Sequence, residues 1–340
     1  MVSMPAWIDV HSHIYPRPYR AMLRSRSQPP RVIEDDGAEY LLLFEEQRDL
    51  PPTAGVKLTA SFTDLNEKIR FMDSLGIAKS VVSVGNPWLD PFSAGNSHDM
   101  ARAINEELSS YERATAGRVV GMGVLPAGDI GLVVQTAHEI ADAAHLYGVV
   151  TGCRIAGHEL DDPALEELWA TAASRNLAML VHPHYSAARS ELTGFGHVLP
   201  VAIGNPFETT IALARLVLAG VLHRHPTLRL IASHGGGALP YLAARLDATW
   251  RSSPALHDRL PHPPSEDLRK LFVDTIVFHE RSMRAAADLV GASHMVFGTD
   301  HPFAVADPPA NIAALNAAFG TEDLEEIGSR SAQAALAIDA

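Results

Sequence analysis

Short runs of apolar, mostly β-branched residues alternate along the chain with longer stretches that have the spacing of amphipathic helices. Eight such runs occur, and most are apolar at consecutive positions rather than at every second position. Continuous apolar runs are typical of parallel strands that are covered on both faces, whereas half-exposed strands alternate. The predicted strands are Trp7–His13, Lys79–Val84, Val119–Leu125, Gly148–Ile155, Ala178–His184, Leu228–His234, Leu271–Thr275 and His294–Asp300.

The stretches between these runs predict helices. In Asp64–Leu75 the apolar residues Leu65 and Ile69 share one helical face, and Gly76 follows as a C-terminal stop signal. Pro163–Arg175 begins with a proline, which a first helical turn tolerates because no N–H is needed there. The other predicted helices are Met100–Thr115, Leu132–Leu146, Thr209–Leu222, Ala238–Trp250 and Glu280–Leu289, with a closing helix in Thr321–Ala340.

This regular alternation predicts an α/β fold, a (β/α)₈ or TIM barrel, with a doubly wound open sheet as the alternative. A length of 340 residues fits one large barrel or two ordinary domains, and the sequence contains no visible linker or repeat. We therefore expect a single barrel domain over residues 1–340. Residues 14–63 and 185–207 break the alternation. We expect the first, an insertion after strand 1, to cover the barrel mouth, and the second to act as a functional loop.

Histidine or aspartate stands at the C-terminal ends of four predicted strands. His11 and His13 end the first strand two positions apart, so they point to the same face. His182, His234 and Asp300 end the fifth, sixth and eighth strands, and such ends form the catalytic face of a barrel. Each residue alone could be structural, for example Asp300 as a helix N-cap. Three imidazoles and a carboxylate on one rim, however, favour a site for Zn²⁺ or a similar divalent ion.

Four motifs, in this order along the chain, resemble the amidohydrolase-related (amidohydrolase 2) metal-dependent decarboxylase family: WIDVHSHIYP, LVHPHY, ASHGGGALPYLAARLD and FGTDHPF. The resemblance covers nearly the whole chain. It implies that His11, His13, His182 and Asp300 bind the metal and that His234 is the catalytic acid or base beside it. It also implies Zn²⁺, with Mn²⁺ as the alternative, and no organic cofactor.

The substrate-binding residues follow the family pattern less closely. Arg245 matches an arginine that in the family meets a substrate carboxylate from a neighbouring subunit, so the resemblance implies a homodimer. A helix-packing arginine is the alternative interpretation. The family's second substrate-binding arginine, in an aromatic–Arg–Pro context, is absent from this sequence. The remaining candidates for substrate binding or proton transfer are Lys57, Arg48, His184 and His301.

The resemblance implies a non-oxidative carboxy-lyase that acts on a conjugated or aromatic carboxylic acid. The same site could instead hydrolyse a C–C, ester, lactone or amide bond, or hydrate a conjugated double bond, because activity depends on the site rather than on the scaffold. A catalytically silent metal-binding protein is a third hypothesis. The complete set of candidate ligands argues against it.

Composition narrows the range of partners. The formal net charge is −13 and no cluster of Lys and Arg is visible, which argues against nucleic-acid binding. No run approaches the roughly 18 consecutive apolar residues of a membrane helix, and the N-terminus lacks a signal-peptide pattern. The single cysteine, Cys153, excludes a disulfide within one chain and favours a reducing compartment. We therefore expect a cytoplasmic enzyme that acts on a small carboxylic acid.

Overall fold

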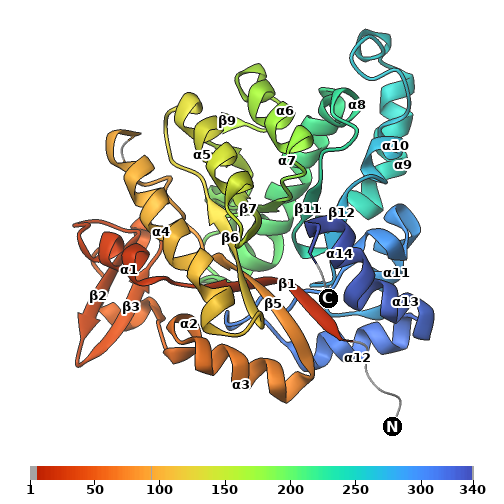
Figure 1. Ribbon diagram of the computed structural model, residues 1–340. Coiled ribbons are helices and arrows are strands. Elements are labelled where there is room, and N and C mark those ends of the chain that lie inside the picture. The colour runs from red at the N-terminus through yellow and green to blue at the C-terminus, as the bar shows by residue number, and fades with distance from the viewer. Residues whose placement is uncertain (1–5, 93, 339–340) are drawn as a thin grey trace.

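The computed structural model describes residues 6–92 and 94–338, and a parallel eight-stranded sheet forms its centre. Val10 N–H donates to Phe297 O at 2.9 Å, which brings the end of the last strand beside the first and nearly closes the sheet into a barrel (Figure 1). The predicted barrel and its eight strands are confirmed. In spatial order the strands are β1 (Trp7–Ile14), β5 (Ile77–Val84), β6 (Val119–Val124), β7 (Leu146–Gly152), β10 (Met179–His182), β11 (Leu230–Ala232), β12 (Phe272–Asp274) and β13 (Met295–Val296).

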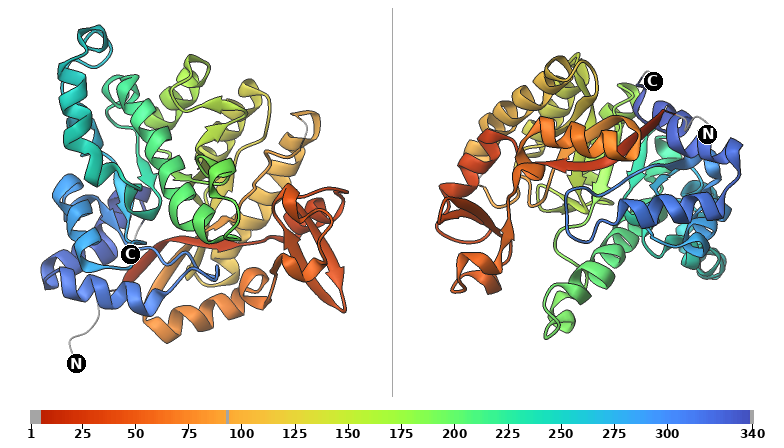
Figure 2. Two further views of the ribbon diagram at one scale, coloured as in Figure 1. Left: turned by 180° about the vertical axis from the view of Figure 1, so that it is seen from behind. Right: turned by 90° about the horizontal axis from the view of Figure 1, so that it is seen from below.

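Helices surround the sheet on its outer side, as Figures 1 and 2 show. Helix α3 (Leu65–Leu75) follows the sequence signals closely. The side chain of Asp64 caps its start by accepting the N–H of Asn66, and Gly76 ends it with a φ of 70°. The helices between and after the barrel strands are α3 (Leu65–Leu75), α4 (Ala94–Ala114), α5 (Ile130–Asp142), α6 (Glu166–Ser174), α7 (Asn205–Leu218), α8 (Val221–Arg224), α9 (Leu239–Arg251), α10 (Pro264–Leu268), α11 (Glu280–Val290), α12 (Pro308–Ala318), α13 (Thr321–Glu325) and α14 (Ser331–Leu336).

Three predicted helices have wrong bounds, the first being Met100–Thr115, which begins at Ala94 as α4. Helix α5 ends at Asp142 rather than Leu146, because Ala143 is already extended and β7 starts at Leu146. Gly148 is therefore not a helix stop. It lies inside the strand with a φ of 144°, where a Cβ atom would meet Ala178 O at 2.8 Å. The predicted helix Thr209–Leu222 begins earlier, at Asn205, and is broken at Gly220, which has a φ of 73°.

The insertion after β1 forms a small unit of its own beside the barrel, coloured red in Figure 1. Its aromatic residue Phe44 reaches the loop that follows β10, where it stacks on His184 and lies 3.9 Å below the guanidinium of Arg189. The insertion therefore meets the barrel mouth through this contact. Its elements are α1 (Arg17–Arg24), the antiparallel strands β2 (Arg31–Asp35), β3 (Ala38–Leu42) and β4 (Val56–Lys57), and α2 (Ala60–Thr63).

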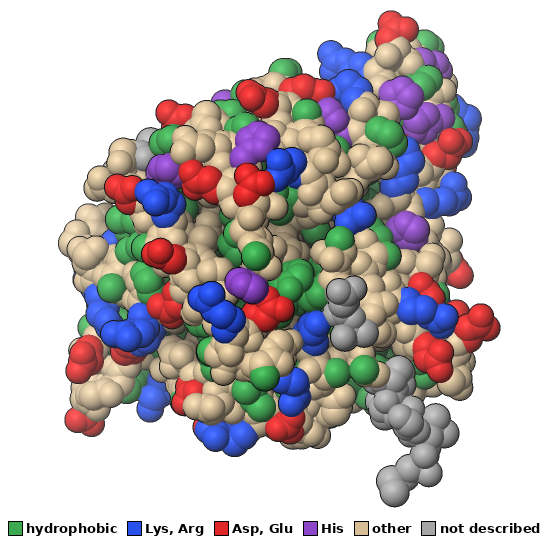
Figure 3. Space-filling model, viewed as in Figure 1, with side chains coloured by type: hydrophobic (Ala, Val, Ile, Leu, Met, Phe, Trp, Pro, Cys, Tyr) green, Lys and Arg blue, Asp and Glu red, His purple; other side chains and the backbone are tan. Residues whose placement is uncertain are grey.

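Within the described residues, one helical stretch, Pro200–Leu218, is long and apolar enough to cross a membrane by length and composition. It consists of a short π-helical turn followed by α7. One side of α7 packs into the barrel core through residues such as Leu213 and Leu216, and the other side exposes Phe207 and Ile211. This pattern is that of a barrel helix with an uncovered apolar outer face. Acidic and basic side chains are interspersed over most of the face that Figure 3 shows.

Candidate metal centre

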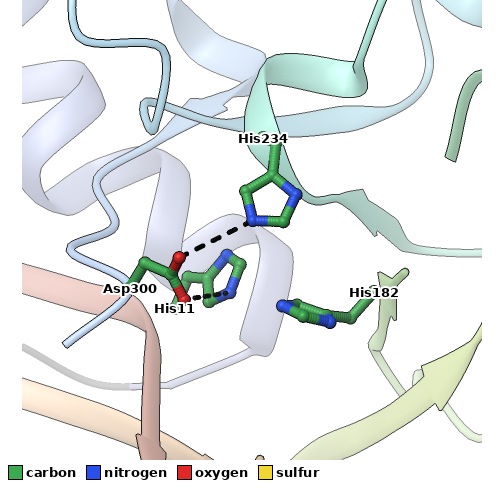
Figure 4. Close-up of side chains that lie close together, drawn as sticks. All are labelled: His11, His182, His234 and Asp300. Atoms are coloured by element: carbon green, nitrogen blue, oxygen red, sulfur yellow. Dashed lines mark ion pairs between the residues drawn. The ribbon is translucent and has the colours of Figure 1, made fainter. Parts of the chain in front are cut away.

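Five polar side chains converge at the C-terminal ends of the strands, as the sequence predicts. The ring centroids of His11 and His182 lie 5.0 Å apart, and those of His182 and His234 lie 5.2 Å apart. One ligand atom from each of His11, His182, His234 and Asp300 lies within 4.8 Å of the others (Figure 4). His13 belongs to the same group, because its Nε2 lies 3.1 Å from both His11 Nε2 and Asp300 Oδ1. We call these five residues the histidine–aspartate cluster.

The cluster fits a divalent metal ion. His182 Nδ1 donates to Pro183 O at 2.8 Å, so Nε2 of this ring keeps its lone pair. That nitrogen is buried and has no hydrogen-bond partner among the described residues. A buried acceptor without a partner is costly, and a bound cation would satisfy it. Three or four imidazoles with one carboxylate are also a donor set that Zn²⁺ and related ions accept.

The electrostatics of the cluster also suit a cation. Burial lowers the pKa of His13 to about 4, and burial together with the neighbouring imidazoles lowers the pKa of His182 well below its usual value. Burial opposes ionisation of Asp300, but hydrogen bonding to His13 and His234 holds its pKa well below the ordinary range. At neutral pH His13 and His182 therefore offer neutral imidazoles and Asp300 an ionised carboxylate, which are the forms that bind metal.

The backbone is strained at two positions of the cluster. His234 has a φ of 53° and Asp300 a φ of 57°, in the left-handed region that residues other than glycine seldom adopt. After His234 the chain turns sharply through glycines. At Gly237, with a φ of 63°, a Cβ atom would meet Pro206 O at 2.2 Å. Strain of this kind persists where the surrounding structure fixes a functional geometry.

A carboxylate outside the five predicted residues holds the cluster together. Asp274, at the end of β12, accepts a 2.6 Å hydrogen bond from His11 Nδ1 and accepts the backbone N–H groups of His234 and Gly235 at 2.8 and 2.9 Å. Burial opposes the charged form of His11, but the hydrogen bond and the charge of Asp274 raise its pKa. Because Nδ1 of His11 carries the donated proton, its Nε2 is left free for a metal.

Sequence analysis missed Asp274 and also Lys68. Lys68, on α3, is fully buried, and its Nζ donates to Ser12 Oγ at 2.6 Å and to His13 O at 3.1 Å. Through these two hydrogen bonds it stabilises the end of β1, which carries His11 and His13. For Asp274 the available signal was a charged residue at the C-terminal end of the seventh strand. For Lys68 the signal was a charged residue on the apolar face of the predicted helix, three positions after Leu65 and four before Met72.

The structure places the predicted substrate-binding residues in two kinds of location. His184 is buried at the barrel mouth between Phe44 and Trp88, and its Nδ1 has no hydrogen-bond partner in the described part of the chain. His301 lies close to the cluster in sequence, but its Nδ1 is bonded to Lys68 at 2.7 Å. The three cations lie on the surface of this chain and are not brought to the cluster: Arg48, which pairs with Glu45, Lys57 on β4, and Arg245 on α9.

A model of the amidohydrolase family matches residues 8–337. The chain is 27% identical to a 2-amino-3-carboxymuconate-6-semialdehyde decarboxylase of Dictyostelium discoideum over 60% of this chain, and the match spans 57% of that relative, less than two thirds. It is 25% identical to the 6-methylsalicylic acid decarboxylase acuB of Aspergillus aculeatus, over 88% of this chain and 85% of the relative. The crystal structure of Metarhizium anisopliae IDCase in apo form is similar with a TM-score of 0.91 and 32% identity, over 98% of each chain.

We expect Asp274→Asn to weaken metal binding by about 10- to 100-fold, because the ring of His11 loses its charged partner. The measurement is competition for Zn²⁺ against a chelator of known affinity, with circular dichroism as the test of folding. Asp288→Asn, at an exposed position on α11, is the matched control and should bind like the parent protein. A folded Asp274→Asn variant with unchanged affinity would show that this carboxylate does not tune the site.

Proposed function

The chain belongs to the amidohydrolase family, and from this membership we propose that it is a metal-dependent, non-oxidative decarboxylase of an aromatic or conjugated carboxylic acid. The observation that carries the proposal is the histidine–aspartate cluster at the barrel mouth, whose His182 Nε2 has no hydrogen-bond partner in the part of the chain that the structure describes. The decarboxylases of Dictyostelium discoideum and Aspergillus aculeatus support the reaction type by similarity.

The proposed metal ligands are His11, His13, His182 and Asp300, with Zn²⁺ as the preferred ion and Mn²⁺ as the alternative. A divalent ion held there supplies Lewis-acid polarisation of substrate oxygens. His234 is also within reach of the cluster, since its Nε2 lies 3.8 Å from Asp300 Oδ2. We assign it to proton transfer rather than to permanent ligation, as the resemblance of its sequence motif implies, and Asp274 holds its backbone beside the cluster.

The residues of this chain account for the remaining steps. His234, as the imidazolium, gives a proton to the ring carbon that carries the carboxylate. The bond between that carbon and the carboxylate then breaks, its electron pair returns to the ring, and CO₂ leaves. Solvent reprotonates His234, so one proton is consumed for each carboxylate lost and no redox step occurs. Asp274 keeps His11 and the His234 turn in place throughout.

We also propose a homodimer. On α9, Tyr241 is 87% exposed and precedes the exposed Arg245 by one helical turn. The residue before α9, Ala238, donates its N–H to Thr210 Oγ1 of α7 at 2.8 Å, and α7 itself exposes Phe207 and Ile211. Exposed apolar patches often mark subunit interfaces. A partner's copy of this surface would present Arg245 to a substrate carboxylate.

The test of the proposed reaction is CO₂ release by the metal-loaded protein from a panel of aromatic and unsaturated carboxylic acids. We expect at least one acid to release CO₂ and a chelator to abolish the release. If no acid releases CO₂ from protein that carries one metal per chain, the decarboxylase assignment is wrong, and lactones, esters and ring-cleavage products should then be tested as substrates for hydrolysis.

Substitution of a metal ligand and substitution of the proton donor should have different effects on metal content and turnover. Asp300→Ala should lose metal and activity together, whereas His234→Ala should keep the metal and lose about 10²- to 10⁴-fold in kcat. Metal content by mass spectrometry and turnover measured on the same samples separate these outcomes, and the exposed His138→Ala on α5 should match the parent. A His234→Ala variant that turns over normally would remove this residue from the reaction.

If α9 forms the proposed dimer interface, Tyr241→Glu should convert the dimer to a monomer, because the new carboxylate would be buried against the apolar surface of the partner subunit. Sedimentation velocity at micromolar concentration measures this change. Arg245→Gln should leave the dimer intact and raise KM for the acid. A parent protein that sediments as a monomer would contradict the proposed dimer.

A further inference from the structure

A recess at the barrel mouth lies next to the strand that carries His182. It is formed by residues that follow β5 and β6 and by the end of β7 and the residues after it, among them Trp88, Asp90, Gly152 and Arg154. Gly152 is the register partner of His182, and the ring of Trp88 lies 5.9 Å from the ring of His182. A molecule bound at the cluster would therefore have this recess next to it.

Aromatic side chains lie between the histidine–aspartate cluster and the recess. The indole of Trp88 contacts the rings of both His182 and His184, and it is fixed by donation from its Nε1 to Val84 O at 3.1 Å. The ring of Tyr185 lies 4.3 Å from that of His184. Flat, rigid surfaces of this kind suit an aromatic ring.

Asp90 is the unusual residue of the recess. Its carboxylate accepts one hydrogen bond, from Tyr185 Oη at 3.2 Å, and it forms no ion pair with any residue in the described ranges. Arg154, the cation of the recess, is instead bonded through Nε to Glu159 at 2.7 Å. Burial raises the pKa of Asp90 to about 6. A carboxylate accepts about four hydrogen bonds, so within residues 6–92 and 94–338 most of its acceptor positions have no protein donor.

We propose that Asp90 determines substrate specificity by accepting a hydrogen bond from an O–H or N–H group on the substrate ring. The inference rests on the proposed decarboxylation and narrows its substrate class. The carboxylate that is lost faces the cluster, the ring lies along Trp88 and Tyr185, and the donor group points at Asp90. A methoxy group cannot donate there, and a second carboxylate would be repelled by the charge of Asp90.

The experiment compares pairs of ligands that differ in one donor. Binding of 2-, 3- and 4-hydroxybenzoate to the metal-loaded protein is measured by calorimetry beside the corresponding methoxybenzoates, and kcat and KM are measured for every acid that releases CO₂. In at least one ring position we expect the hydroxy acid to bind about tenfold or more tightly than its methoxy partner. Asp90→Ala should abolish that preference, with the loss in KM rather than in kcat.

Two further variants separate recognition from structure. Tyr185→Phe removes the hydroxyl that donates to Asp90 but keeps the carboxylate, so the preference for the hydroxy acid should remain. Asp35→Asn, at an exposed position in β2, should change nothing. No hydroxy preference at any position, or an Asp90→Ala variant that weakens hydroxy and methoxy acids equally, would overturn the assignment. Because binding is read without turnover, a failure of CO₂ release alone would count against the reaction and not against Asp90.

Discussion

The hydrogen bond between His11 Nδ1 and Asp274 Oδ2 is the contact on which the geometry of the site depends. The same carboxylate accepts the backbone N–H groups of His234 and Gly235, so one buried side chain ties the first strand of the barrel to the turn after β11. His11 and Asp274 are 263 residues apart in sequence and meet only because the barrel nearly closes between β13 and β1. The geometry of the site therefore depends on closure of the barrel, because an open gap between β13 and β1 would separate His11 from Asp274.

The strain in the site follows from the same constraint. His234 and Asp300 both lie in the left-handed region of backbone space, and the turn beyond His234 packs so tightly that Gly237 has no room for a side chain. A continuous strand would place these side chains in the alternating pattern of a sheet. The left-handed turns instead aim both side chains into one small volume, where His11 and His182 are already held. Asp274 holds the turn at His234 through two backbone N–H groups, and the N–H of Asp300 donates to His11 O at 2.8 Å.

The sequence predicted the barrel and the converging residues because both depend on local patterns. Continuous apolar runs identify covered parallel strands, and a histidine or aspartate at a strand end must lie on the mouth of a barrel. Asp274 and Lys68 were missed because their roles depend on partners far away in the chain, such as His11 for Asp274 and Ser12 for Lys68. The end of α5 was misplaced because Gly148 resembles a helix stop but serves a close approach to Ala178 inside a strand. Charge and position alone likewise cannot tell a surface arginine such as Arg48 from one that binds substrate.

The central claim is that the cluster promotes loss of CO₂ with protonation by His234, without addition of water. Mass spectrometry of the products formed from the panel of acids, in D₂O and separately in ¹⁸O-labelled water, tests this claim most directly. We expect a product that has lost CO₂ and gained one deuterium at the vacated carbon, with no ¹⁸O in the remaining molecule. A product that carries ¹⁸O from the solvent would contradict it, because that label is the signature of hydrolysis or hydration at the same metal centre.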